Sequence, residues 1–276
     1  MIDTWMARLR EPRFGVVFCT AVIAFLMSAH WTPMALPGAV VIVLAVLRPQ
    51  VAVRPLVWWV MAVLWFAALI LVQDRMEDHV FLFSVWLVAL AICLARDDDT
   101  FLDQAAWQAR VLIGVTFAAA VGWKLVFNEY VSGMTLWGFI LLDHRMAPLA
   151  TGLGISDTAV AQGRSALSEV MAGGPDVYQA PSDLMWRVSV VAVLTLLLEG
   201  AIAVSHLLPG SSRLAVLRLP SIVVFGVVTY SVVPVLPFAA LLGTLAIVVA
   251  GWRREVMWVL PVMVLPSVIR LVILQM

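Results

Sequence analysis

The stretch that decides the fold is residues 104–127, QAAWQARVLIGVTFAAAVGWKLVF. It is apolar except for glutamine side chains near its start, Thr116 and two cations, Arg110 and Lys124. A helix needs about 20 predominantly apolar residues to cross the hydrocarbon core of a bilayer. The stretch therefore predicts a transmembrane helix, and the two cations within it need a physical explanation.

The rest of the chain has the same character. Of its 276 residues, 63% are apolar and 12% are charged, against roughly 25% charged in an average soluble domain. The formal net charge is zero and the mean hydropathy is +1.04. This composition excludes a soluble enzyme, a nucleic-acid-binding protein with a basic face and a disordered chain. Two cysteines, both in apolar runs, exclude a disulfide scaffold. We expect an all-α, polytopic transmembrane bundle that forms a single integral membrane domain over residues 1–276.

Charged and proline-rich punctuation divides the chain into nine apolar segments. They are residues 14–30, 34–48, 55–72, 79–95, 104–127, 184–208, 216–233, 237–251 and 255–275. The second is short and is expected to pair with the first as a tight hairpin. Pro261 and Pro266 predict a kink in the last, because each proline removes a helix hydrogen bond.

The arginines predict the orientation of these segments. With a cytoplasmic N-terminus, the inner loops hold ten arginines and the outer loops three, which agrees with the positive-inside rule. The inner ten are Arg8, Arg10, Arg13, Arg48, Arg54, Arg96, Arg213, Arg218, Arg253 and Arg254. Nine spans then place the C-terminus outside. The preference for arginine over lysine, with much alanine and valine, suggests a GC-rich bacterial genome and hence a multi-pass protein of the cytoplasmic (inner) membrane.

One long segment, residues 128–183, lies between predicted spans on the outer face. Val131–Leu149 is apolar around Asp143, His144 and Arg145, and is expected to form a re-entrant or interfacial helix. From Ser156 to Gly173 the pattern predicts a capped amphipathic helix. Loops this long are usually functional, so we expect any site to open outward.

Charges at bilayer depth cost about 2.5–3.5 kcal/mol on insertion scales, so each is expected to have a partner or a role. Arg110 and Glu199 lie about 9 Å and about 13 Å from the inner ends of consecutive predicted spans, at 1.5 Å per residue. Such depths predict an Arg110–Glu199 ion pair. Its role is a structural staple or a redox or proton relay.

Lys124 is the single lysine beside sixteen arginines. Its ammonium either snorkels to the outer interface or is desolvated enough to act as a general base. Possible partners on the same side are Glu129, Asp143, His144, His79 and His30. Glu129, Asp143, His144 and Trp123 are the candidates for substrate binding. No His, Cys, Asp and Glu grouping has metal-ligand spacing, so no metal site is predicted.

The segments Trp107–Arg110, Val115–Leu125 and Asn128–Gly133 carry a family resemblance. They resemble the horizontally transferred transmembrane (HTTM) domain family, which includes the vitamin K-dependent gamma-carboxylases. In that family a helix with aromatic and small residues ends in Lys-Leu, followed by an acidic-aromatic pair and a glycine. Here these are Lys124-Leu125, Glu129-Tyr130 and Gly133, and Leu198-Glu199-Gly200 resembles the family's glutamate-bearing helix. The DoxX-like quinone-associated proteins are a more distant relative.

The resemblance implies an outward cavity of quinone or lipid size, with a quinone as a possible cofactor. It also implies a base at Lys124, as the family lysine deprotonates the reduced quinone. The chain departs from the carboxylases by lacking their lumenal domain after the last span. Two hypotheses follow. The first is a non-catalytic membrane component or accessory subunit that binds a lipid, a quinone or a membrane protein partner. The second is a quinone- or lipid-linked membrane enzyme that uses Lys124.

Overall fold

The computed structural model describes residues 2–28, 32–72, 78–173 and 182–275, and every regular element within these ranges is helical. The first half contains α1 (Ile2–Arg10), α2 (Pro12–Met27), α3 (Ala35–Leu47), α4 (Pro49–Ala52), α5 (Pro55–Leu71), α6 (Asp78–Leu94) and α7 (Asp98–Val126). The second half contains α8 (Asn128–Val131), α9 (Met134–Leu142), α10 (Ala147–Gly152), α11 (Asp157–Met171), α12 (Ser182–Leu207), α13 (Arg218–Val232), α14 (Leu236–Val249) and α15 (Val259–Gln275). Short 3-10 turns are η2 (Thr32–Met34), η4 (His144–Met146), η5 (Arg213–Leu217) and η6 (Arg254–Val256).

Each of the nine predicted apolar segments coincides with a helix. Four helical stretches are long and apolar enough to cross a membrane: Asp98–Val126, Leu184–Leu207, Arg213–Val232 and Arg254–Ile273. Five further apolar stretches have 10–17 residues: Pro12–Met27, Thr32–Leu47, Pro55–Leu71, His79–Leu94 and Leu236–Val249. The all-helical class is therefore confirmed for the described residues, and the four long helices agree with a membrane protein.

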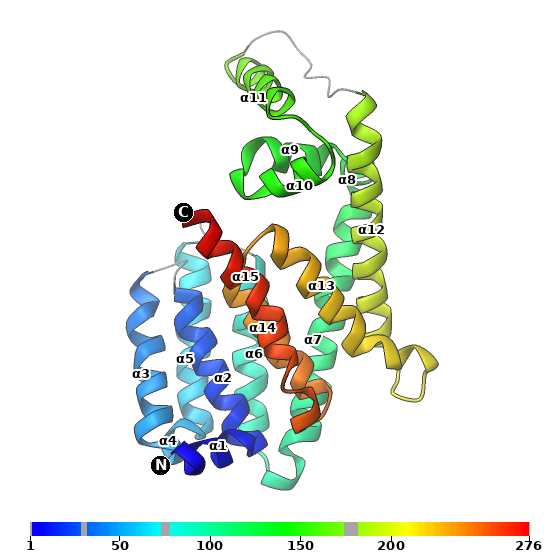
Figure 1. The fold of residues 1–276 in the computed structure, drawn as a ribbon. Helices are drawn as coiled ribbons and strands as arrows, with labels where there is room; N and C mark the ends of the chain where they lie inside the picture. Colours follow the sequence, from blue (N-terminus) through cyan, green and yellow to red (C-terminus); the bar gives the residue numbers. More distant parts are fainter. Residues whose placement is uncertain (1, 29–31, 73–77, 174–181, 276) are drawn as a thin grey trace.

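Helix α7 is the central element of the bundle. Its buried residues Phe101, Ala105, Ala109, Ile113 and Phe117 recur every four residues and form one continuous face. This helix packs against α2, α6, α12 and α14 (Figure 1). It begins before the predicted start of its span, since two aspartates in its first turn stabilise the positive end of the helix dipole.

The predicted hairpin of the first two apolar segments is present as the packed pair α2 and α3 (Figure 1). Gly38 lets the two backbones touch, because a Cβ atom there would lie 2.8 Å from the Cα atom of Phe25. Pro266 lies inside α15, which runs without a break from Val259 to Gln275.

The offset of α12 along the axis of α7 decides which part of α12 extends beyond the bundle. A Cβ atom on Gly114 would lie 2.8 Å from the side chain of Leu207, so the last residue of α12 is level with the middle of α7. The first half of α12 consequently extends past the end of α7, as Figure 1 shows. There Val188 and Ala192 form a second apolar cluster with α9 and α10.

The segment between α7 and α12 folds into short helices over that extension. The predicted capped helix is found as α11, where the Ser156 hydroxyl accepts a hydrogen bond from the Ala159 amide at 3.2 Å. Arginines bind backbone carbonyls across the segment: Arg164 donates to Leu141 and Arg187 to Leu153. Helices α9, α10 and α11 are stacked beyond the end of the bundle at which α15 ends (Figure 1). We call residues 128–173 with the first half of α12 the cap.

Candidate functional site

The structure joins Lys124 of α7 to Glu199 of α12. The Lys124 Nζ atom lies 2.5 Å from the Glu199 Oε1 atom. Their side chains are 19% and 7% exposed, respectively. The Lys124 ammonium also lies 4.7 Å from the centre of the Tyr130 ring, in a cation–π contact. These three residues form the most buried charged centre among the described residues, at the junction of the bundle and the cap.

The Arg110–Glu199 ion pair expected from the sequence is not formed. That expectation placed the inner ends of both spans at the same height, whereas Leu207 at the end of α12 is level with Gly114. Eight residues back from Leu207, Glu199 is level with about residue 122 of α7 and meets Lys124. Glu199 is paired, but with Lys124 and not with Arg110, because the relative position of the helices along their axes decided the pairing.

Arg110 lies in a different environment. Its guanidinium is close enough to Arg218 and His206 to act on both electrostatically. Its Nε atom is buried and has no hydrogen-bond partner among the described residues. Arg110 thus belongs to a cationic cluster at the other end of α12.

Glu199 retains an unused acceptor. Its Oε2 atom is buried and has no hydrogen-bond partner within the described part of the chain. A buried carboxylate oxygen without a partner is costly, and such atoms mark either strain or a place for a ligand or water. The centre can therefore offer one carboxylate oxygen as an acceptor, while the Lys124 ammonium is already engaged.

Trp123 and Glu129 immediately precede Lys124 and Tyr130 in the chain, but their side chains make their contacts elsewhere. The Trp123 side chain is 68% exposed and packs on Phe127, with ring centres 4.3 Å apart. Glu129 is exposed and lines a cavity of about 300 Å³ with Trp137 and Leu167, between α8–α9 and α11. No contact in the described residues joins either side chain to Lys124.

Asp143 and His144 lie at the start of η4. Asp143 accepts hydrogen bonds from the Arg145 Nε atom at 2.8 and 3.0 Å and from the Arg145 amide at 2.9 Å. His144 is 82% exposed. Neither residue contacts Lys124 in the described part of the structure. Of the remaining expected partners, His79 is buried and stacks on Phe238, and His30 lies outside the described residues.

The Asp143–Arg145 pair gives a pH-dependent prediction. Hydrogen bonds from Arg145, which outweigh partial burial, lower the pKa of Asp143 below its ordinary value of 3.8. A carboxyl whose pKa is lowered on folding stabilises the fold above its ordinary pKa, and this contribution is lost as the pH falls through the folded value. We expect the thermal midpoint of the wild type to fall more between pH 5 and pH 3 than that of Asp143→Asn. Equal falls, measured by differential scanning fluorimetry, would contradict this.

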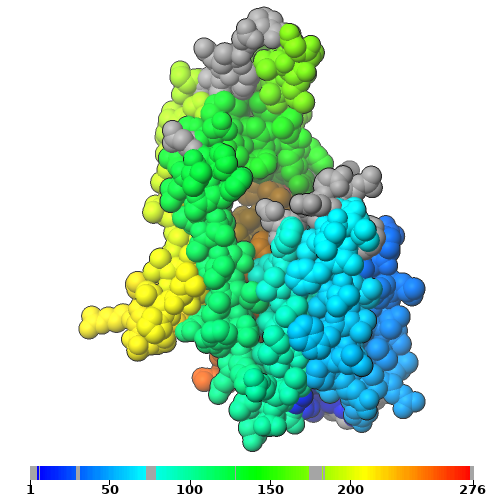
Figure 2. All heavy atoms as spheres, turned by 180° about the vertical axis from the view of Figure 1, so that it is seen from behind, coloured from blue at the N-terminus to red at the C-terminus, as the bar shows by residue number. Residues whose placement is uncertain are grey.

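A hollow separates the cap from the bundle on one face. In Figure 2 it lies between the green residues of α7–α9 and the cyan residues of α6, with orange atoms of the α13–α14 region at its back. Elsewhere in the bundle, aromatic rings connect α7, α13 and α14: Phe117 packs on Phe225, and Tyr230 packs on both Phe225 and Phe238. The hydroxyl of Tyr230 is buried and has no partner among the described residues.

Comparison with protein-family models, with curated proteins and with solved structures finds no match to this chain. Within the described ranges, no group of three or more His, Cys, Asp or Glu side chains is arranged to hold a metal ion.

The two neighbours of Lys124 in the structure were not expected from the sequence: Tyr130 was not predicted to contact it, and Glu199 was not predicted to be its partner. The available signals were the position of Tyr130, six residues after Lys124 and just beyond the end of α7, and the resemblance, whose motifs contain all three residues.

Proposed function

We propose that this chain is an HTTM-like protein of the bacterial inner membrane that crosses the bilayer nine times, with its N-terminus in the cytoplasm. Two observations support this topology. Nine apolar helical stretches are present in the described residues, and the first and last helices end at opposite ends of the bundle (Figure 1). The excess of arginine in the predicted inner loops gives the direction.

The topology can be tested by labelling single cysteines. In a background with Cys19 and Cys93 replaced by alanine, Ser165→Cys places a thiol on the exposed face of α11 and Ser211→Cys on the exposed α12–α13 loop. In intact cells, a membrane-impermeant maleimide is expected to label position 165, whereas labelling of position 211 requires permeabilisation. The reverse pattern would invert the orientation.

For its activity, we propose a non-catalytic membrane component or accessory subunit, whose hollow between cap and bundle takes a lipid, a quinone or a segment of a membrane protein partner. The observation that carries this is the Lys124–Glu199 contact at 2.5 Å. The two side chains compensate each other's charge across α7 and α12, and both are largely buried. The pair is best suited to hold α7 and α12 together.

The unused Oε2 atom of Glu199 favours a second candidate, a quinone- or lipid-linked membrane enzyme. A bound quinone would supply redox chemistry, and Glu199 Oε2 would fit its reduced quinol form, by accepting a hydrogen bond from a quinol hydroxyl. In this case Lys124 has a chemical role, either as the base that the resemblance implies or as the partner that orients Glu199.

The double variant Lys124→Met/Glu199→Met separates the two candidates. It removes both charges at nearly constant volume and leaves no buried charge unpaired. If the pair is structural, the folded double variant is expected to support the full phenotype in a strain that depends on this gene. A double variant that is as stable as the wild type but inactive would overturn the non-catalytic proposal in favour of the enzyme.

A further inference from the structure

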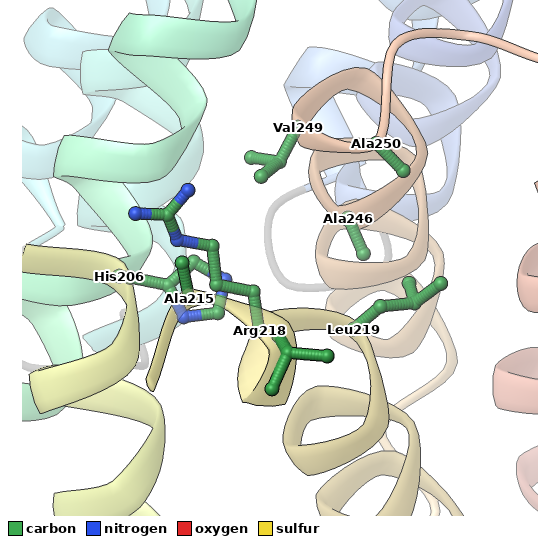
Figure 3. A pocket seen from close by; sticks show the side chains of 8 residues that line it. His206, Ala215, Arg218, Leu219, Ala246, Val249 and Ala250 are labelled. Carbon is green, nitrogen blue, oxygen red and sulfur yellow. The ribbon is translucent and has the colours of Figure 1, made fainter. Parts of the chain in front are cut away.

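A second site lies at the opposite end of α12 from the cap. A cavity of about 190 Å³ opens between the last turn of α12, the start of α13 and the end of α14. His206 and Arg218 line one side, and the small residues Ala246 and Ala250 line the other (Figure 3). A cavity with two nitrogen-bearing side chains facing two alanines has a polar wall and room for a small group.

The guanidinium of Arg218 is held in place at this cavity. Its Nε atom donates to the Ser205 carbonyl at 2.9 Å and its Nη2 atom donates to the Leu208 carbonyl at 2.6 Å. Figure 3 shows the side chain extended away from α13, with its guanidinium in the space between the helices. The backbone carbonyls orient the group without neutralising its charge.

Arg110 adds a second positive charge from α7. It lies within electrostatic range of both Arg218 and His206. No salt bridge to either arginine is present in the described part of the chain, and the Arg110 Nε atom is buried without a hydrogen-bond partner. Arg218 lines the cavity and Arg110 acts on it electrostatically from α7. Two half-buried cations that influence each other without a carboxylate partner among the described residues call for an anion.

An apolar groove adjoins the same wall. It has a volume of about 420 Å³ and is lined by Leu197, Gly200 and Val204 of α12 and by Leu214 and Leu217 of η5. Two of its lining residues, Ser205 and Leu217, immediately precede His206 and Arg218, which line the cationic cavity. The cationic cavity and the apolar groove therefore lie on either side of the same wall, which is formed by the last turn of α12 and the junction of η5 with α13.

We propose that Arg218 binds the phosphate of an anionic phospholipid, with Arg110 supplying a second positive charge from α7, and that one acyl chain of this lipid lies in the groove between α12 and η5. Guanidinium groups bind phosphate through paired, charge-assisted hydrogen bonds. A free phosphate ion shares that chemistry, but it would leave the adjoining apolar groove unexplained. This site does not depend on the Lys124–Glu199 centre or on the proposed function.

The test is native mass spectrometry of the full chain purified in detergent and titrated with phosphatidylglycerol or phosphatidylcholine. The wild type is expected to bind phosphatidylglycerol more tightly. Arg110→Gln is expected to weaken that binding about fivefold, the effect of one basic residue near an anionic headgroup, and to leave phosphatidylcholine binding unchanged. Arg110 is the better position to change, because its Nε atom makes no hydrogen bond that the fold would lose.

Two further variants sharpen the result. Arg213→Gln removes an exposed arginine of the same loop and is expected to change binding by less than about twofold. Ala250→Leu fills the cavity without changing charge and is expected to weaken phosphatidylglycerol binding as Arg110→Gln does. The proposal is overturned if the wild type shows no preference, if Arg110→Gln retains it, or if inorganic phosphate competes as well as the lipid does.

Discussion

Replacing Lys124 with methionine is expected to lower the free energy of unfolding by about 3–5 kcal/mol, the usual cost of removing one partner of a buried ion pair. The reason is the partner that remains. The Glu199 side chain is 7% exposed, and one of its oxygens already has no partner in the described structure. Without the ammonium, a whole carboxylate would be buried uncompensated. Thermal unfolding of the purified chain in detergent micelles or nanodiscs measures the effect.

Three control variants show whether this loss of stability comes from breaking the ion pair. Lys124→Arg keeps the charge and is expected to lose less stability than Lys124→Met. Glu199→Met alone should be about as damaging as Lys124→Met, because it leaves the lysine unpaired. The double variant Lys124→Met/Glu199→Met should recover most of the loss, since replacing both members of a buried pair by apolar residues is often neutral. Additive losses in this double-mutant cycle would show that the two residues are not coupled.

The second large effect is expected at Gly133, where the cap begins. Gly133 has a φ of +84°, and a Cβ atom there would lie 2.9 Å from the Ser189 amide nitrogen of α12. Gly133→Val would cost about 1–2 kcal/mol for the left-handed backbone and about 1–3 kcal/mol for overpacking. The hydrogen bond from the Ser189 hydroxyl to the Ser132 carbonyl, 2.6 Å long, would be displaced as well. We expect a lower thermal midpoint and faster proteolysis within the cap.

Gly138 is the matched control for this substitution. It lies five residues further on, inside α9, and a Cβ atom there would have nothing within 4 Å. Gly138→Ala is therefore expected to raise stability slightly, by about 0.5–1 kcal/mol, since alanine is the better residue inside a helix. If Gly133→Val left the cap as stable as Gly138→Ala does, the close approach of α8–α9 to α12 would be refuted.

For the candidate site, sequence patterns identify the buried charged residues but not which of them pair. Lys124 and Glu199 are recognisable in the sequence as charges inside apolar segments, because the cost of burying a charge makes each exceptional. Their partners are not recognisable, because span boundaries say where a helix meets the interface only to within a few turns. A shift of α12 along α7 exchanged Arg110 for Lys124 as the partner of Glu199. Arg110 instead acts electrostatically on Arg218, which lines the cationic cavity.

In the cap, too, some features follow from neighbouring residues in the sequence and others only from the tertiary structure. Helix α11 is predictable because its start depends on neighbouring residues, the Ser156 hydroxyl and the Ala159 amide. The environment of Glu129 is not, since it depends on how α9 and α11 fold back after α7. Asp143 was expected near Lys124, whereas its carboxylate is held by Arg145 two residues on.

What the sequence determined by itself is the helical class, the placement of the apolar helices and the choice of residues whose burial needs an explanation. These follow from hydropathy and from hydrogen bonding within a helix, both of which act over a few residues. Only the tertiary structure decided that Glu199 meets Lys124 and Tyr130, and that Arg110 approaches Arg218. Such pairings depend on how two helices are offset along their axes. That offset is set by contacts such as Gly114 against Leu207, between residues more than ninety positions apart in the chain.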